Sequence, residues 1–131
     1  MASNNPDAWL NYGKSLVAIK HNHDALEAFN RALSIQPNYF EALLNQGAIL
    51  KELQKHADAL QSVDRAISLR PDFAQAWLNR GTILKALNQI DAAIASYDKA
   101  ISLNPELAEA WSNKATALKD LKRYPEAISY Y

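Results

Sequence analysis

The chain contains only three glycines, Gly13, Gly47 and Gly81, separated by a constant step of 34 residues. Proline, alanine, serine and asparagine recur at the same step. These columns are Pro37, Pro71 and Pro105; Ala32, Ala66 and Ala100; Ser34, Ser68 and Ser102; and Asn11, Asn45, Asn79 and Asn113. A period of this length is typical of a repeat protein, in which similar units stack and each is stabilised by its neighbours.

The period predicts three full repeats and a truncated fourth. Counted from Pro6, they span 6–39, 40–73, 74–107 and 108–131. Within each repeat, apolar residues recur three and four positions apart, which predicts two amphipathic helices joined by a short turn. The proline column should end the second helix, because proline disfavours helical backbone in the residue before it. The sequence therefore predicts an all-α solenoid of helix-turn-helix units forming one domain, 1–131.

Composition excludes several classes of protein. The 131 residues suffice for one domain, and 14 basic and 14 acidic residues leave no net charge, so a nucleic-acid partner is not expected. The absence of cysteine excludes disulfides and thiolate metal sites. No apolar run approaches transmembrane length and the first residues do not resemble a signal peptide, so we expect no membrane partner and a cytoplasmic location.

The ordered small and large residues of each repeat resemble the tetratricopeptide repeat. In the first repeat they are Trp9, Gly13, Leu16, Ala25, Phe29, Ala32 and Pro37. The resemblance covers nearly the whole chain and implies a non-enzymatic protein-interaction module whose first helices line a concave surface. Large residues sixteen positions after the glycines and Ala115 should fill the space that these small residues leave; they are Phe29, Val63, Tyr97 and Tyr131.

One column departs from the family pattern. Where the family often has leucine just before the glycine, this chain has Tyr12, Gln46, Arg80 and Lys114. These side chains predict more polar packing between neighbouring repeats.

The asparagine column is the main candidate for a binding site. A side-chain amide offers both donors and an acceptor, so it can pair with a peptide group. A similar asparagine ladder in the tetratricopeptide repeats of O-linked N-acetylglucosamine transferase grips extended peptides, and the resemblance implies the same role for Asn11, Asn45, Asn79 and Asn113. The alternative is that these amides satisfy neighbouring backbone groups.

Leucines and lysines complete the predicted groove. Leu10, Leu44 and Leu78 are expected to be exposed beside the asparagines and to bury apolar side chains of the ligand. Lys14, Lys51, Lys85 and Lys119 either orient a ligand or simply suit the ends of their helices. Some tetratricopeptide domains clamp acidic chaperone tails with basic residues, but Leu10 and Gln75 stand where such residues would be needed, which argues against this ligand.

The remaining features define the alternatives. No catalytic motif is present, so neither enzymatic activity nor a cofactor is expected. His21, His23 and His56 lie near equivalent turns and are expected to be solvated side chains, not metal ligands. Two other functions stay open: a structural module that self-associates through its open repeat ends, with Ile128, Tyr130 and Tyr131 at the contact, or a substrate-docking fragment of a larger enzyme.

Overall fold

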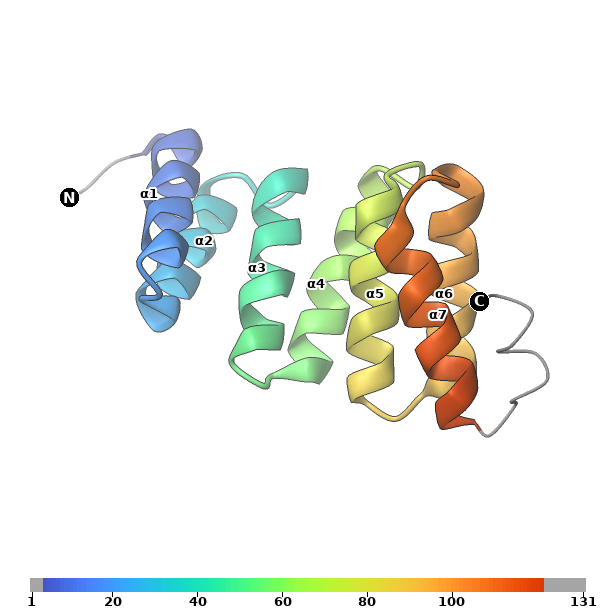
Figure 1. The fold of residues 1–131 in the computed structure, drawn as a ribbon. Helices are drawn as coiled ribbons and strands as arrows, with labels where there is room; N and C mark the ends of the chain where they lie inside the picture. Colours follow the sequence, from blue (N-terminus) through green and yellow to red (C-terminus); the bar gives the residue numbers. More distant parts are fainter. Residues whose placement is uncertain (1–3, 122–131) are drawn as a thin grey trace. The chain divides into compact units, whose positions relative to one another are not determined.

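The computed structural model describes residues 4–121, and all regular secondary structure in this range is helical (Figure 1). The helices are α1 (Pro6–Ala18), α2 (Asn22–Ile35), α3 (Phe40–Glu52), α4 (His56–Leu69), α5 (Ala74–Ala86), α6 (Ile90–Leu103) and α7 (Ala108–Asp120). Odd-numbered helices are the first helices of the repeats, and even-numbered helices are the second. The predicted all-α architecture of tandem helix pairs is therefore confirmed.

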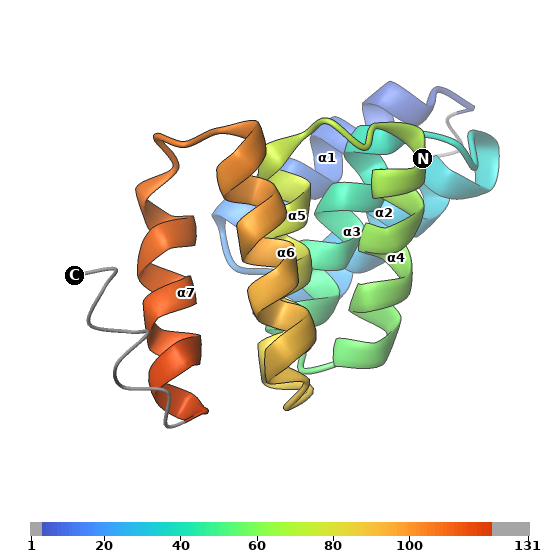
Figure 2. The ribbon, with the colours of Figure 1, turned by 90° about the vertical axis from the view of Figure 1, so that its right-hand side faces the viewer.

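The helices form two compact units. Unit 1 ends at Pro71 and contains α1 to α4, and unit 2 begins at Asp72 and contains α5 to α7. In unit 1, α2 packs against both α1 and α3, and α4 packs against α3 (Figure 1). In unit 2, α6 packs against both α5 and α7 (Figure 2). Both α2 and α6 thus contact the first helix of their own repeat and that of the next repeat.

The second helices end where the proline column predicts. Their C-cap residues are Gln36, Arg70 and Asn104, and each cap residue directly precedes a proline. The backbone N–H of each cap still donates to a carbonyl four residues earlier. Proline has no N–H to continue this ladder, so the chain leaves the helix at that point.

The turns between first and second helices contain one left-handed residue each. Lys20, Gln54 and Asn88 have φ values of 62°, 65° and 62°. This conformation returns the next N–H to the end of the preceding helix, as where His21 N donates to Leu16 O at 2.9 Å. No glycine occupies these three turns, so each of the three holds an L-residue in a backbone region that glycine adopts at lower cost.

The glycine column lets first and second helices of one repeat approach closely. A Cβ atom at Gly13 would lie 2.5 Å from the ring of Phe29, and Gly47 and Gly81 face Val63 and Tyr97 in the same way. All three facing side chains are fully buried. The expectation that these large residues fill the space opposite the glycines is therefore confirmed.

Candidate peptide-binding surface

The asparagine column lies on the accessible side of the first helices. Asn11 is exposed, whereas Asn45, Asn79 and Asn113 are half-buried. Unit 1 thus carries one pair of these amides on α1 and α3, and unit 2 carries the other pair on α5 and α7.

Two of the four amides make hydrogen bonds within their own helix. Asn45 Nδ2 donates to Glu41 O at 2.8 Å, and Asn79 Oδ1 accepts from Gln75 Nε2 at 3.0 Å. Each bond uses only part of the capacity of the amide, which has two donor hydrogens and an acceptor oxygen. Asn45 keeps its acceptor and Asn79 keeps its donors for another partner.

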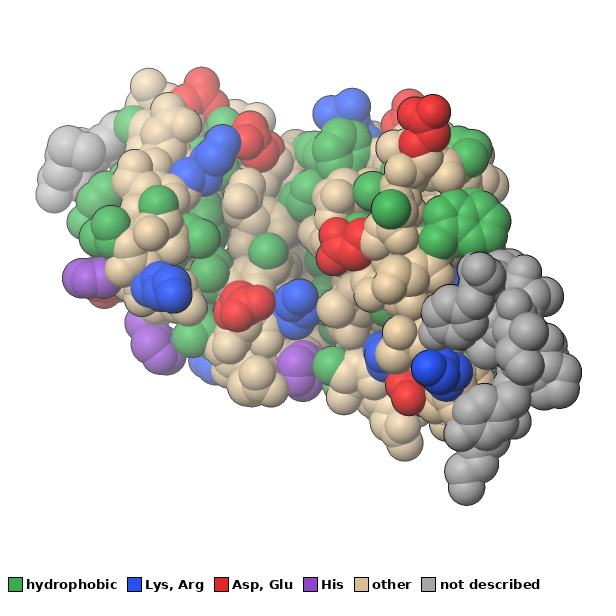
Figure 3. Space-filling view, in the orientation of Figure 1, with side chains coloured by type: hydrophobic (Ala, Val, Ile, Leu, Met, Phe, Trp, Pro, Cys, Tyr) green, Lys and Arg blue, Asp and Glu red, His purple; other side chains and the backbone are tan. Residues whose placement is uncertain are grey.

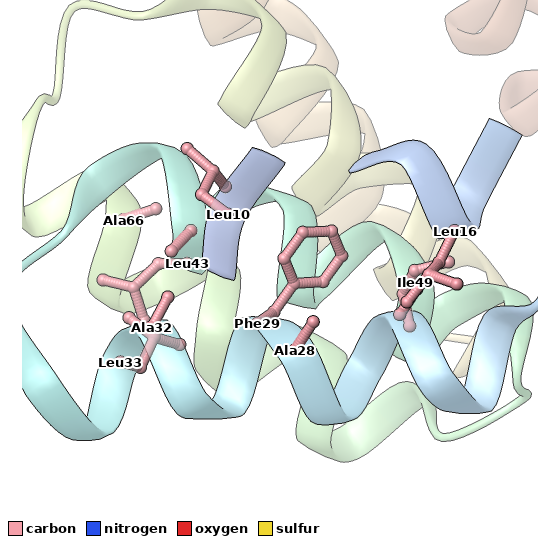
Figure 4. Close-up of a cluster of buried hydrophobic side chains, with 11 residues drawn as sticks. Leu10, Leu16, Ala28, Phe29, Ala32, Leu33, Leu43, Ile49 and Ala66 are labelled. Carbon is pink, nitrogen blue, oxygen red and sulfur yellow. The ribbon is translucent and has the colours of Figure 1, made fainter. Parts of the chain in front are cut away.

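The leucine column does not lie where the sequence analysis places it. Leu10 and Leu78 are 3% and 1% exposed, and Leu44 is half-buried. Figure 4 shows Leu10 within the buried cluster of unit 1, which also contains Leu43 and Ala42. The prediction of exposed leucines beside the asparagines was therefore wrong for Leu10 and Leu78. Leu10 lies on α1 and Leu78 on α5, and these helices contact α3 and α7 respectively as well as second helices, so their buried arc is wider than a single apolar stripe.

Two of the four lysines form ion pairs between first helices. Lys14 Nζ on α1 lies 2.9 Å from Glu41 Oε2 on α3 in unit 1. Lys85 Nζ on α5 lies 3.4 Å from Asp120 Oδ2 on α7 in unit 2. These lysines were candidates from the sequence, but their acidic partners were not predicted. The available signal was opposite charge on the first helices of successive repeats, at repeat positions seven apart for Lys14 and Glu41 and one apart for Lys85 and Asp120.

A third contact in unit 1 joins the start of α3 to α1. The hydroxyl of Tyr39 donates to Asp7 Oδ1. Burial, followed by the hydrogen bond to Asp7 and the negative charges of Asp7 and Glu41, raises the pKa of Tyr39 to about 12. This hydrogen bond leaves the charge of Asp7 in place, but it fixes the orientation of the Asp7 carboxylate at the start of α1.

Charges of both signs are mixed on the first-helix side. Figure 3 shows acidic and basic side chains interspersed on the displayed face of each unit, with no large area of one sign. Together with the two ion pairs, this distribution leaves no strong field that would attract a highly charged ligand.

The polar column before the glycines forms a hydrogen-bonded layer in unit 1. Gln46 Nε2 donates to Asn30 Oδ1 on the preceding second helix, and Gln46 Oε1 accepts from Ser62 Oγ on the following one, both at 2.7 Å. These side chains also line a polar cavity of about 390 Å³ on the second-helix side.

The same column carries charged side chains in unit 2. Lys114, only 8% exposed, lies with its Nζ 2.6 Å from Asp98 Oδ1 on α6. Arg80 donates to Ser96 Oγ at 2.8 Å within its own repeat. Polar contacts at this column are therefore confirmed in both units.

Other predicted features give no site. His21, His23 and His56 belong to no group of three potential metal ligands among residues 4–121. In the same range no helix is long and apolar enough to cross a membrane. Ile128, Tyr130 and Tyr131 lie outside the described residues, so self-association through them stays a prediction.

Family models identify the repeats from the sequence. Models described as tetratricopeptide repeat match residues 10–72, 44–84, 74–107 and 96–129. The chain belongs to the tetratricopeptide repeat family. No curated protein sequence matches this tetratricopeptide chain.

Solved structures with the same fold include several tetratricopeptide proteins. The crystal structure of MamA is 26% identical, with a TM-score of 0.93 over 97% of this chain and 74% of that one. The first tetratricopeptide domain of Spaghetti bound to the HSP90 peptide SRMEEVD is 19% identical, with a TM-score of 0.88 over 93% and 97% of the two chains. A mutant O-GlcNAc transferase of Thermobaculum terrenum is 28% identical, with a TM-score of 0.81 over 86% of this chain and 22% of that one.

Proposed function

We propose that this chain is a protein-interaction module that binds an extended peptide segment of a partner along the asparagine column. The observation that carries the proposal is that each unit carries two of these amides at equivalent positions of its first helices, on α1 and α3 in unit 1 and on α5 and α7 in unit 2. Asn45 and Asn79 keep hydrogen-bonding capacity beyond their local bonds. Amides that pair with peptide groups recognise an extended main chain without requiring a particular side-chain sequence.

Two of the similar structures support a peptide ligand. The Spaghetti domain was solved with a peptide bound, and it shares the fold of this chain. The O-GlcNAc transferase structure is 28% identical to this chain. The asparagine column of this chain resembles the asparagine ladder of that enzyme family, and this resemblance supports the same mode of binding here.

The paired lysines define the charge of the ligand. Because Lys14 and Lys85 are neutralised by Glu41 and Asp120, they offer little attraction to a carboxylate. The expected ligand is therefore a polar peptide with little net charge. We expect the acidic peptide SRMEEVD to bind no better than a neutral peptide of the same length.

The buried leucines limit the affinity. Four net hydrogen bonds of about 0.5–1.5 kcal/mol each supply roughly 2–6 kcal/mol, whereas micromolar binding needs roughly 8 kcal/mol. Leu10 and Leu78 are buried and cannot supply the difference by covering apolar side chains of the ligand. We therefore expect dissociation constants above the micromolar range for a single peptide.

The proposal is tested by selecting peptides from a random decapeptide library and titrating the selected peptides into the protein. Loss of two amides in the Asn45→Ala/Asn79→Ala variant should weaken binding roughly 5- to 150-fold, the equivalent of two hydrogen bonds of about 0.5–1.5 kcal/mol each. Chemical-shift changes on titration should map to the first helices.

The matched control is Gln61→Ala, which removes an exposed amide from the second helix α4. It should leave the affinity unchanged, and circular dichroism should show the same helicity for all variants. A library that yields no binding peptide, or equal binding by the double variant, would contradict the proposal.

A further inference from the structure

The outer face of α1 in unit 1 carries exposed apolar side chains. Tyr12 and Ile19 are 52% and 62% exposed, and they alternate with the smaller Ala8 and Ser15. These four residues are spaced four, three and four positions apart, so they form one straight stripe along the helix. We call Ala8, Tyr12, Ser15 and Ile19 the α1 stripe. In unit 1, α2 and α3 pack against other sides of α1 (Figure 1).

The equivalent stripes of later first helices are covered. In α3 the stripe includes Ala42, Gln46 and Ile49, and α2 packs on it, with Asn30 bonded to Gln46. In α7 it includes Lys114, which pairs with Asp98 of α6. This side of a first helix is therefore a helix-packing surface in the repeat, and on α1 no helix among the described residues of unit 1 covers it.

Tyr12 distinguishes the α1 stripe from the covered ones. Gln46 and Lys114 stand at the same repeat position and bond to a polar side chain of the preceding second helix. Tyr12 instead has its ring against that of Trp9, with ring centroids 6.2 Å apart. The α1 stripe carries no charge. It therefore suits a partner helix with an apolar face better than a second helix that presents a polar side chain opposite Tyr12, as α2 presents Asn30 to Gln46.

The α1 stripe is complementary in size to itself. About a twofold axis midway between residues 13 and 14, two antiparallel copies bring Ala8 opposite Ile19 and Tyr12 opposite Ser15. Each large side chain then faces a small one, which is the condition for close packing between helices. A parallel pairing would instead place Tyr12 against Tyr12 and Ile19 against Ile19.

We propose that two copies of this chain associate through their α1 stripes as an antiparallel, twofold-symmetric pair. Twofold pairing uses the same patch on both copies, so the self-complementary stripe satisfies both sides at once. The flanking Asn11 and Ala18 are uncharged, so no like charges meet on that side of the stripe. This surface differs from the asparagine column and also from the C-terminal residues named in the sequence analysis.

The association is measured by sedimentation equilibrium of the whole chain from about 5 µM to about 500 µM, because an interface of one helix per copy lies at the weak end of specific contacts. The wild type should approach the dimer mass over this range. Tyr12→Lys and Ile19→Lys should each weaken dimerisation at least tenfold. A wild type that stays monomeric, or a dimer unaffected by both variants, would overturn the proposal.

Val17→Lys is the matched control. Val17 is 37% exposed and lies about 140° around the helix from Tyr12, outside the stripe. The other repeats carry Lys51, Lys85 and Lys119 at this position, so the substitution suits the fold. This variant should dimerise like the wild type, and equal loss in Val17→Lys and Tyr12→Lys would contradict a stripe-specific contact.

Crosslinking tests the orientation independently. The chain has no cysteine, so single variants report one position each. Under mild oxidation, a mixture of Ala8→Cys and Ile19→Cys should form a mixed disulfide dimer, and neither variant should crosslink efficiently by itself. Efficient self-crosslinking of Ala8→Cys would show a parallel pair and overturn the antiparallel arrangement.

Discussion

Unit 1 and unit 2 use the same repeat position to connect successive helices, but with different chemistry. In unit 1, Gln46 connects Asn30 and Ser62 through neutral hydrogen bonds. In unit 2, Lys114 forms an ion pair with Asp98, and the lysine is almost fully shielded from solvent. The repeat period determines where this contact forms, and the two residues that meet there together determine whether the contact is neutral or charged.

The largest expected effect comes from removing one partner of each contact. Asp98→Ala leaves the shielded ammonium of Lys114 without this carboxylate, so it should lower the free energy of unfolding by about 1–3 kcal/mol. Asn30→Ala leaves a neutral amide short of one acceptor and should cost about 1 kcal/mol. Urea denaturation followed by circular dichroism measures both values.

A double variant sharpens this comparison. Asp98→Asn/Lys114→Gln replaces the ion pair of unit 2 with a neutral pair like that of unit 1, and it should recover part of the loss seen in Asp98→Ala. Equal costs for Asp98→Ala and Asn30→Ala would show that charge is not what distinguishes the two units.

The turns provide a smaller difference between the units. Lys20 in unit 1 and Asn88 in unit 2 both have a left-handed backbone, which asparagine tolerates better than lysine. Lys20→Gly should therefore raise the free energy of unfolding by up to about 1 kcal/mol, and Asn88→Gly by less. Thermal and urea denaturation measure the change. Lys20→Ala is the control, because it keeps a Cβ atom and should give no gain.

The smallest expected effect is the pH dependence of the stability that Tyr39 contributes to unit 1. Unit 2 has Phe73 and Leu107 at the equivalent repeat positions, and neither side chain has a hydroxyl. The pKa of Tyr39 rises from 10 to about 12 on folding, so the folded state holds its proton more tightly. The resulting stabilisation is fully present below about pH 10 and is lost as the pH rises towards about 12.

Tyr39→Phe tests this dependence by urea denaturation between about pH 8 and about pH 11. The variant should be less stable by about 0.5 kcal/mol near neutral pH, because it lacks the bond to Asp7. Its deficit should shrink as the pH rises above 10. Burial also raises the pKa of Tyr97 in unit 2, so Tyr97→Phe provides the corresponding comparison there. A deficit for Tyr39→Phe that stays constant with pH would contradict the role of the phenol proton.

The fold could be predicted from the sequence because the residues that form each local feature recur with the 34-residue period. The glycine column, its large partners and the proline column each predict one feature, and the structure confirms all three. The polar contacts at Gln46 and Lys114 also follow from a departure that is visible in the sequence.

The candidate site was harder to predict. A helical wheel considers one helix and one buried stripe, so it placed Leu10 and Leu78 on the exposed side. Their burial depends on a neighbouring helix that the wheel does not contain. The pairing of Lys14 with Glu41 joins residues far apart in the chain, and only the packing of α1 beside α3 brings them together.

The polar contacts between successive repeats limit how freely one repeat can be moved to another place in the chain. The pair Gly13 and Phe29 lies inside one repeat, so a repeat moved to another place in the chain carries this contact with it. The pairs Gln46–Asn30 and Lys114–Asp98 each join two repeats, so moving one repeat separates the partners. A rearranged or lengthened array of these repeats would therefore keep the packing within each helix pair, but it would need new polar residues at each junction.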